Sequence, residues 1–161
     1  MTSSTLVRPV HPPAGSRVSS ARAPEIAITG LGTTLERAFE DAAAATFALM
    51  ADVHRIRPER TIPVSFLEHE QGLALARWLE LLLDTAREHH LVFGEFHLQR
   101  ERDRWWGCAT GERRRAPLLR DVRILRVGPA VVHTAEGWEV RCLAHCRPRM
   151  PAVDQMARAP E

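Results

Sequence analysis

Hydrophobic and small side chains recur along residues 30–53 with the 3.6-residue period of an amphipathic helix. The stripe consists of Leu35, Ala38, Phe39, Ala42, Thr46, Leu49, Met50 and Val53. Thr33, followed three residues later by Glu36, predicts a capping box at the start of this helix. Residues 25–29 are rich in β-branched side chains and run into Gly30-Leu31-Gly32. The order predicts a strand, a glycine turn and a helix over 33–54, although Gly-x-Gly without a third glycine does not identify a nucleotide-binding loop.

A second periodic segment covers residues 70–89, after a predicted strand at 61–66 in which Pro63 is typical of a sheet edge. Its inner stripe is Leu75, Leu79, Leu82, Leu83 and Ala86, widened by Trp78. Alternating segments then predict strands at 91–99, 104–111, 122–132 and 138–146, with turns at Asp103 and at Glu136-Gly137. We therefore expect an α+β fold, a two-layer domain with both helices packed on one mostly antiparallel sheet.

Composition limits the number of domains to one. The chain has 161 residues and is 45% hydrophobic, which is enough for a real core. All 22 basic residues are arginine, and Lys, Asn and Tyr are absent, which suggests GC-rich codon usage. The presence of any single arginine is therefore weaker evidence of a functional role. Residues 1–23 contain no acidic residue and show no periodicity, so they predict a disordered, weakly basic tail. Residues 148–161 are also predicted to be a disordered tail, which leaves 24–147 as the domain.

Several features indicate the compartment. No apolar run approaches the 18 residues needed to span a membrane. The N-terminus lacks the apolar region of a signal peptide. The three cysteines, Cys108, Cys142 and Cys146, are an odd number without a disulfide framework. We therefore expect a cytoplasmic protein in a reducing environment, with no membrane partner.

The segment Cys142-x-x-His145-Cys146 offers zinc-type ligands, because thiolate sulfur and imidazole nitrogen are the donors that zinc prefers. On a strand, however, Cys142 and Cys146 share one face about 13 Å apart, at roughly 3.3 Å per residue, and His145 points to the other face. Zinc would require the segment to leave the strand and a fourth ligand from elsewhere. Buried core cysteines are the commoner outcome.

Nine arginines between residues 100 and 126 outnumber four nearby acids, and Trp105 and Trp106 lie among them. Guanidinium groups neutralise phosphates and aromatic rings stack on bases, so this composition is typical of an RNA contact. With period two, Arg100, Arg102, Arg104 and Trp106 share one face if no bulge intervenes. The alternative is a solvated sheet face. The spacing predicts no serine, cysteine or histidine triad, so we expect no catalytic residues.

Five groups of motifs, in order over residues 24–146, resemble the archease family. They are Glu25-Ile26-Ala27-Ile28 with Gly30-Leu31-Gly32; Thr34-Leu35-Glu36-Arg37-Ala38-Phe39, similar to the family's TLEEAF; Phe47, Met50 and Asp52 at a helix end; Trp78-Leu79, similar to WLNELL; and Leu91-Val92-Phe93, Gly111-Glu112-Arg113 and Gly137-Trp138. The resemblance implies the family's fold. It also implies an accessory protein, not an enzyme, that promotes guanylylation and turnover of the GTP-dependent RNA ligase in tRNA splicing and RNA repair.

The departures from the family lie at the positions that, by the resemblance, carry its chemistry. The family's Asp-His-Thr-Ala-Asp motif helps to bind a divalent cation, and in the corresponding stretch, residues 21–25, only Glu25 is acidic. A family lysine is replaced by Arg123, and the Asp that ends the last strand by His145. One carboxylate with one imidazole is a poor calcium site and shifts preference toward a transition metal. No cofactor is expected; a divalent cation is left open, with calcium not expected.

The leading hypothesis is therefore an archease-like accessory protein whose partner is an RNA ligase or another RNA-processing protein. The alternative is a stand-alone RNA- or phosphate-binding module on the same fold. In either case the candidate contact residues are Arg102, Arg104, Trp106 and Arg123, and DNA is not an expected partner. A third hypothesis is a small metalloenzyme that uses the two C-terminal cysteines and His145.

Overall fold

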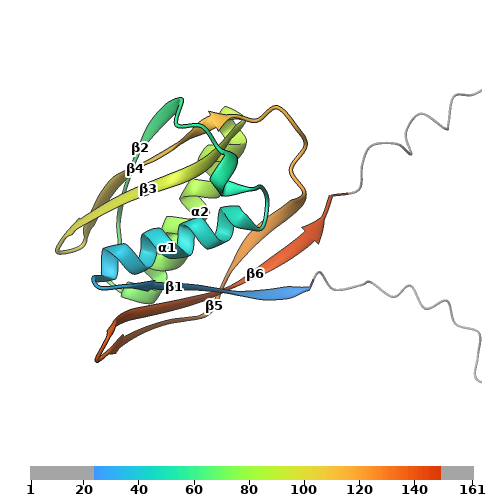
Figure 1. Cartoon of the computed structure of the whole chain (residues 1–161). Coiled ribbons are helices and arrows are strands. Elements are labelled where there is room, and N and C mark those ends of the chain that lie inside the picture. Colours follow the sequence, from blue (N-terminus) through green and yellow to red (C-terminus); the bar gives the residue numbers. More distant parts are fainter. Residues whose placement is uncertain (1–23, 150–161) are drawn as a thin grey trace, which may run out of the picture.

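The computed structural model describes residues 24–149, in which six strands and two helices form one domain (Figure 1). Their order is β1 (Glu25–Gly32), α1 (Leu35–Ala48), the 3₁₀ turn η1 (Val53–Arg55), β2 (Arg60–Leu67), α2 (Gln71–His89), β3 (Leu91–Glu101), β4 (Arg104–Arg113), β5 (Arg120–Thr134) and β6 (Gly137–Pro148). The predictions for residues 1–23 and 150–161 lie outside the described residues. Pro148, which the sequence assigned to the C-terminal tail, is the last residue of β6.

The strands form two antiparallel three-stranded sheets, β1-β6-β5 and β2-β4-β3. Both helices lie between the two sheets, with α1 against β1 and β3 and α2 against β5, β3 and β2 (Figure 1). The predicted α+β class, two helices packed on antiparallel strands, is confirmed. The strands divide into two sheets where one was expected, because strand pairing depends on long-range contacts that local periodicity does not specify.

Helix α1 joins the free edges of both sheets through two neighbouring acidic residues. Glu40 Oε1 accepts a hydrogen bond from the N–H of Leu98 on β3 at 2.9 Å, and Asp41 Oδ2 accepts one from the N–H of Leu31 on β1 at 2.9 Å. Both strands lie at the edge of their sheet, so these carboxylates satisfy backbone donors that no strand pairs.

The predicted start and end of α1 need correction. Its N-cap is Thr34, whose hydroxyl accepts from the N–H of Arg37 at 3.2 Å, and not Thr33 with Glu36. The helix ends at Ala48, six residues before the predicted boundary, and η1 covers part of the remainder. Helix α2, at Gln71–His89, matches its prediction within one residue.

Gly30 and Gly32 belong to β1 and not to a turn, contrary to the prediction. A Cβ atom at either position would collide with the backbone of Ala38 on α1. The two glycines therefore permit close packing of the helix on the strand, which explains their spacing without any ligand.

The core is centred on three aromatic side chains with no exposed surface, Phe39, Trp78 and Trp105. The rings of Phe39 and Trp105 are stacked with centroids 4.8 Å apart. Trp78 Nε1 donates to the carbonyl oxygen of Phe39 at 3.0 Å. The predicted inner stripe of α2 is buried, which confirms it as core. Neither helix within residues 24–149 is long and apolar enough to cross a membrane.

Candidate functional site

Glu25 and His145 are cross-strand neighbours. Glu25 begins β1 and stands opposite His145 on β6, with Oε1 and Nε2 3.5 Å apart. Both side chains reach solvent, with 60% and 38% of their surface exposed. The β1–β6 register thus joins two residues that are 120 positions apart in the sequence.

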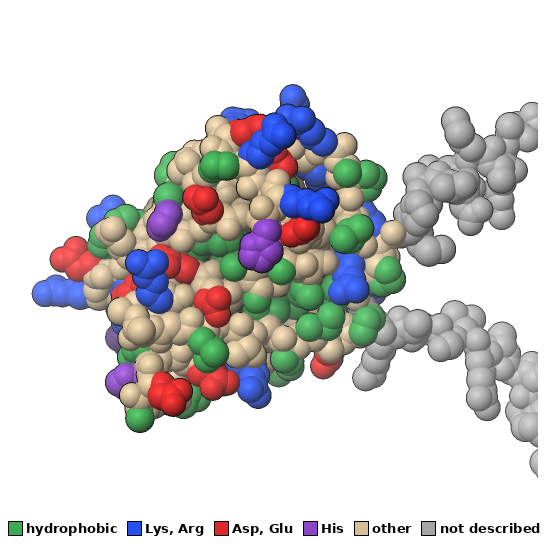
Figure 2. All heavy atoms as spheres, in the orientation of Figure 1, with side chains coloured by type: hydrophobic (Ala, Val, Ile, Leu, Met, Phe, Trp, Pro, Cys, Tyr) green, Lys and Arg blue, Asp and Glu red, His purple; other side chains and the backbone are tan. Residues whose placement is uncertain are grey.

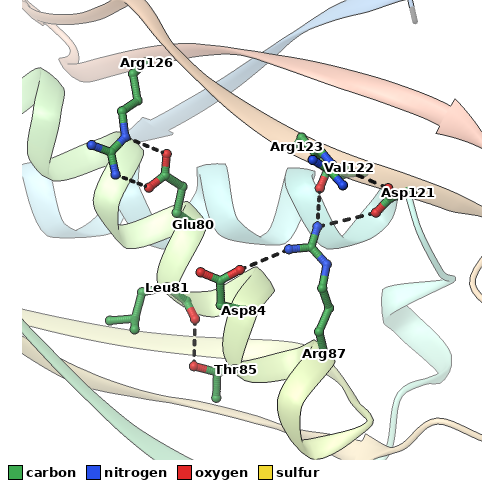
Figure 3. Close-up of polar contacts among 9 residues, drawn as sticks. All are labelled: Glu80, Leu81, Asp84, Thr85, Arg87, Asp121, Val122, Arg123 and Arg126. Carbon is green, nitrogen blue, oxygen red and sulfur yellow. Dashed lines mark hydrogen bonds and ion pairs between the residues drawn. The ribbon is translucent and has the colours of Figure 1, made fainter.

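Arg123 on β5 stands opposite His145 from the other side, so Arg123, His145 and Glu25 form one row across the outer face of the β1-β6-β5 sheet. The Arg123 side chain is 77% exposed, and its Nε lies 3.8 Å from Asp121 Oδ2. Asp121 in turn lies 3.4 Å from Arg87 on α2, which also donates to the carbonyl oxygen of Val122 at 2.8 Å (Figure 3). We call Arg123, His145 and Glu25 the charged row.

Sequence reasoning missed Asp121. It lies two positions before Arg123, so strand periodicity alone places both side chains on the same face. Its role is positional, because it connects Arg123 to α2 through Arg87 (Figure 3).

The charged row does not fit the divalent cation that the resemblance described above implies. It supplies one carboxylate and one imidazole, whereas calcium takes six to eight oxygen ligands. No group of three or more His, Cys, Asp or Glu side chains in residues 24–149 is placed to hold a metal ion. The guanidinium of Arg123, opposite His145, adds a positive charge that repels a cation.

Cys142 and Cys146 face the core, and His145 faces outward, as the alternation of a strand predicted. The two sulfurs and the imidazole therefore lie on opposite sides of β6 and do not form a zinc site, so the metalloenzyme hypothesis is wrong for this trio. Burial raises the pKa of the Cys142 thiol to about 11. The thiol is therefore neutral at physiological pH.

The arginine-rich stretch does not form one face. Arg100 turns inward, with its guanidinium 4.9 Å from the ring centroid of Trp105, because the two-residue turn at Arg102 and Asp103 interrupts the alternation. Arg102 occupies that turn with a positive φ of 55°. The prediction that Arg100 shares a face with Arg104 and Trp106 is therefore wrong.

Arg104 and Trp106 do share the outer face of β4, with the guanidinium 5.8 Å from the indole centroid. Arg123 lies on the other sheet, so the four predicted contact residues are not brought together. Other arginines are held in ion pairs, such as Arg126, which contacts Glu80 through two hydrogen bonds of 2.9 and 2.7 Å (Figure 3). Arginine and acidic side chains are interspersed on the face shown in Figure 2.

The arrangement of two helices and two antiparallel sheets has a solved counterpart. It is similar to the solution structure of Methanobacterium thermoautotrophicum protein 1598, with a TM-score of 0.59 over 75% of this chain and 90% of that chain. At 21% identity this likeness concerns the fold.

The sequence comparison is more specific. The model of the archease protein family (MTH1598/TM1083) matches residues 24–124, which is more than half of the chain. The chain therefore belongs to the archease family. The matched region includes Glu25 and Arg123 and ends before His145.

Curated relatives agree over part of their length. The chain is 35% identical over 78 residues to protein archease of Thermococcus gammatolerans, which covers 48% of this chain and 55% of the relative. It is 35% identical over 72 residues to protein archease of Sulfolobus acidocaldarius, covering 45% and 52%. The chain thus spans about half the length of the curated relatives that it matches.

Proposed function

We propose that this protein is a non-catalytic accessory protein that binds a GTP-dependent RNA ligase, or another RNA-processing protein, and promotes its guanylylation. Membership in the archease family supports this class of function. The observation that carries the proposal is the charged row. Three residues from three strands, at positions where the family has functional residues, converge on an exposed sheet face that neither helix covers.

The chemistry of the charged row suits a protein contact better than catalysis. All three side chains reach solvent, and the guanidinium, imidazole and carboxylate offer hydrogen-bond donors and acceptors and charges of both signs. Charges at the rim of an interface set orientation and association rate. The next row of the same face, Ala27, Leu143 and Leu125, is apolar and supplies the hydrophobic part of a contact. The three cysteines are free thiols, which suits a reducing cytoplasm.

The proposal is tested by ligase guanylylation with radiolabelled GTP, with and without the purified full chain. We expect the protein to accelerate formation of the ligase–GMP adduct. Arg123→Ala should remove most of this stimulation. The matched control, Arg102→Ala, changes an exposed arginine in the β3–β4 turn and should retain it. Absence of any stimulation by the wild type, or equal effects of the two substitutions, would refute the proposal.

A second candidate, an RNA-binding module, is favoured by the Arg104–Trp106 pair on the outer face of β4. A stacked aromatic ring beside a guanidinium is a common element of single-strand recognition. Fluorescence anisotropy with a short single-stranded RNA at several salt concentrations separates the two candidates. Binding that weakens roughly 1–3 kcal/mol on Trp106→Ala, with an unchanged salt slope, would favour the RNA module.

A further inference from the structure

The outer edge of β2 is open. This strand lies at the edge of the β2-β4-β3 sheet, and no other strand within residues 24–149 pairs with its outer side. Two hydrogen bonds establish which backbone groups face outward. The N–H of Glu68 donates toward the β4 side, to the carbonyl oxygen of Asp103 at 2.9 Å. The carbonyl oxygen of Leu67 accepts from Arg77 Nη1 on α2 at 2.7 Å, on the opposite side.

Alternate residues of a strand direct their backbone groups to opposite edges. Because the backbone groups of Leu67 point to the outer edge of β2, those of Ser65 and Pro63 point to the same edge. Pro63 is compatible with this assignment, since proline lacks an N–H and is tolerated where no ladder bond is made. The N–H groups of Ser65 and Leu67 and the carbonyl of Ser65 are therefore directed to the free edge, and both side chains are exposed.

A groove of about 700 Å³ runs beside this edge, between β2 and α2. It is lined by Ser65, Phe66, Leu67, Arg77, Leu81 and Arg104. Phe66 and Leu81 are only partly buried and pack against the margin of the core, and Leu67 is 66% exposed. The groove thus combines free backbone groups, an apolar floor and the guanidinium of Arg104. Arg77 is already engaged, because it donates to the carbonyl oxygen of Leu67 and lies 3.6 Å from Glu68 Oε2.

We propose that the β2 edge binds an extended segment of a partner protein, which adds to the sheet as a fourth strand. Pairing with an exposed edge uses main-chain hydrogen bonds for affinity and pockets for alternate side chains for specificity. A strand about 4.8 Å from β2 places one apolar side chain against Phe66 and Leu81. An adjacent Asp or Glu in the segment meets Arg104, because guanidinium and carboxylate groups form strong charge-assisted pairs.

This site is separate from the charged row, which lies on the other sheet. A failure of peptide binding at the β2 edge can therefore be distinguished from a failure of the proposed ligase role. The groove is suited to an extended partner segment in which an apolar residue is next to an acidic one.

The test uses a phage-displayed library of random 12-residue peptides, selected on the immobilised full chain. Two substitutions of Ser65 isolate the contribution of its backbone N–H to peptide binding. Ser65→Ala removes the hydroxyl and keeps the N–H, whereas Ser65→Pro also removes the N–H that faces the free edge. The β4 ladder is unaffected by this loss, and Pro63 shows that the strand accepts proline two positions away. Thermal melts establish that both variants fold.

We expect enriched peptides that contain an apolar residue next to Asp or Glu. They should bind the wild type and Ser65→Ala equally and Ser65→Pro about tenfold more weakly, the cost of one lost hydrogen bond and a clash with the proline ring. If Ser65→Pro does not fold, amide hydrogen exchange decides the question. The N–H groups of Ser65 and Leu67 should exchange rapidly in the free protein and slowly with peptide bound.

Three results would overturn the proposal. They are an absence of enriched peptides, equal binding to Ser65→Pro, and unchanged exchange at Ser65 and Leu67. Light scattering supplies a further contradiction. A wild-type dimer that Ser65→Pro converts to a monomer would assign the edge to a second copy of this chain.

Discussion

Replacing Phe39 by alanine tests the assignment of the core most sharply. The Phe39 side chain is completely buried, and its ring stacks on Trp105 at 4.8 Å with an interplanar angle of 1°. Alanine removes the ring and leaves the carbonyl oxygen that accepts from Trp78 Nε1, so the loss is one of packing. Deleting a buried Phe side chain costs about 3–5 kcal/mol in lost transfer free energy and residual cavity. The better helix propensity of alanine returns only about 0.5 kcal/mol.

The measurement is urea unfolding, followed by circular dichroism and by tryptophan fluorescence. Coincident transitions establish two-state behaviour, and an unchanged m-value attributes the shift in midpoint to stability. Phe39→Leu is the matched control, because it keeps an apolar side chain and should lose much less free energy of unfolding. A loss below about 1 kcal/mol for Phe39→Ala would refute this account of the core.

Three further predictions concern the helix cap, the metal and a buried thiol. Thr34→Ala should cost about 1 kcal/mol of unfolding free energy, whereas Thr33→Ala should cost almost none; equal losses in urea melts would contradict the cap assignment. Calorimetry should detect no micromolar calcium affinity, and if zinc or manganese binds, His145→Ala should abolish it. Because the pKa of Cys142 is raised in the folded state, its neutral thiol stabilises the fold fully below the ordinary thiol value of 9.0. This contribution to the free energy of unfolding is lost as the pH rises toward about 11. Cys142→Ala should lack this decline in denaturant melts at a series of pH values.

Local periodicity predicted the strongly amphipathic elements well. The stripe of α2 follows from its leucines alone, and the helix was placed within one residue. The start of α1 differs from the prediction because Thr33 and Thr34 are both competent caps and only the backbone conformation decides between them. Gly30-Leu31-Gly32 predicts a turn because glycine is typical of turns, whereas close packing against Ala38 is a tertiary contact that no local pattern contains.

The candidate site was harder to predict. The charged row depends on the register of β1, β6 and β5, which brings together residues from distant segments. Family motifs indicated Glu25, His145 and Arg123 one at a time; only the sheet places them side by side. The arginine-rich face was mispredicted for a local reason. The turn at Arg102 and Asp103 breaks the alternation, so Arg100 covers Trp105 instead of facing solvent with Arg104.

We propose that the charged row binds the RNA ligase. The most direct measurement is the affinity of the purified ligase for the wild type, for Arg123→Glu and for Arg102→Glu, by biolayer interferometry. Both substitutions change net charge equally, and both residues are exposed, so the two variants differ only in the position of the substitution. The account predicts that Arg123→Glu weakens binding by about tenfold or more, with Arg102→Glu close to wild type. Equal affinities for all three proteins, or a larger loss with Arg102→Glu, would contradict it.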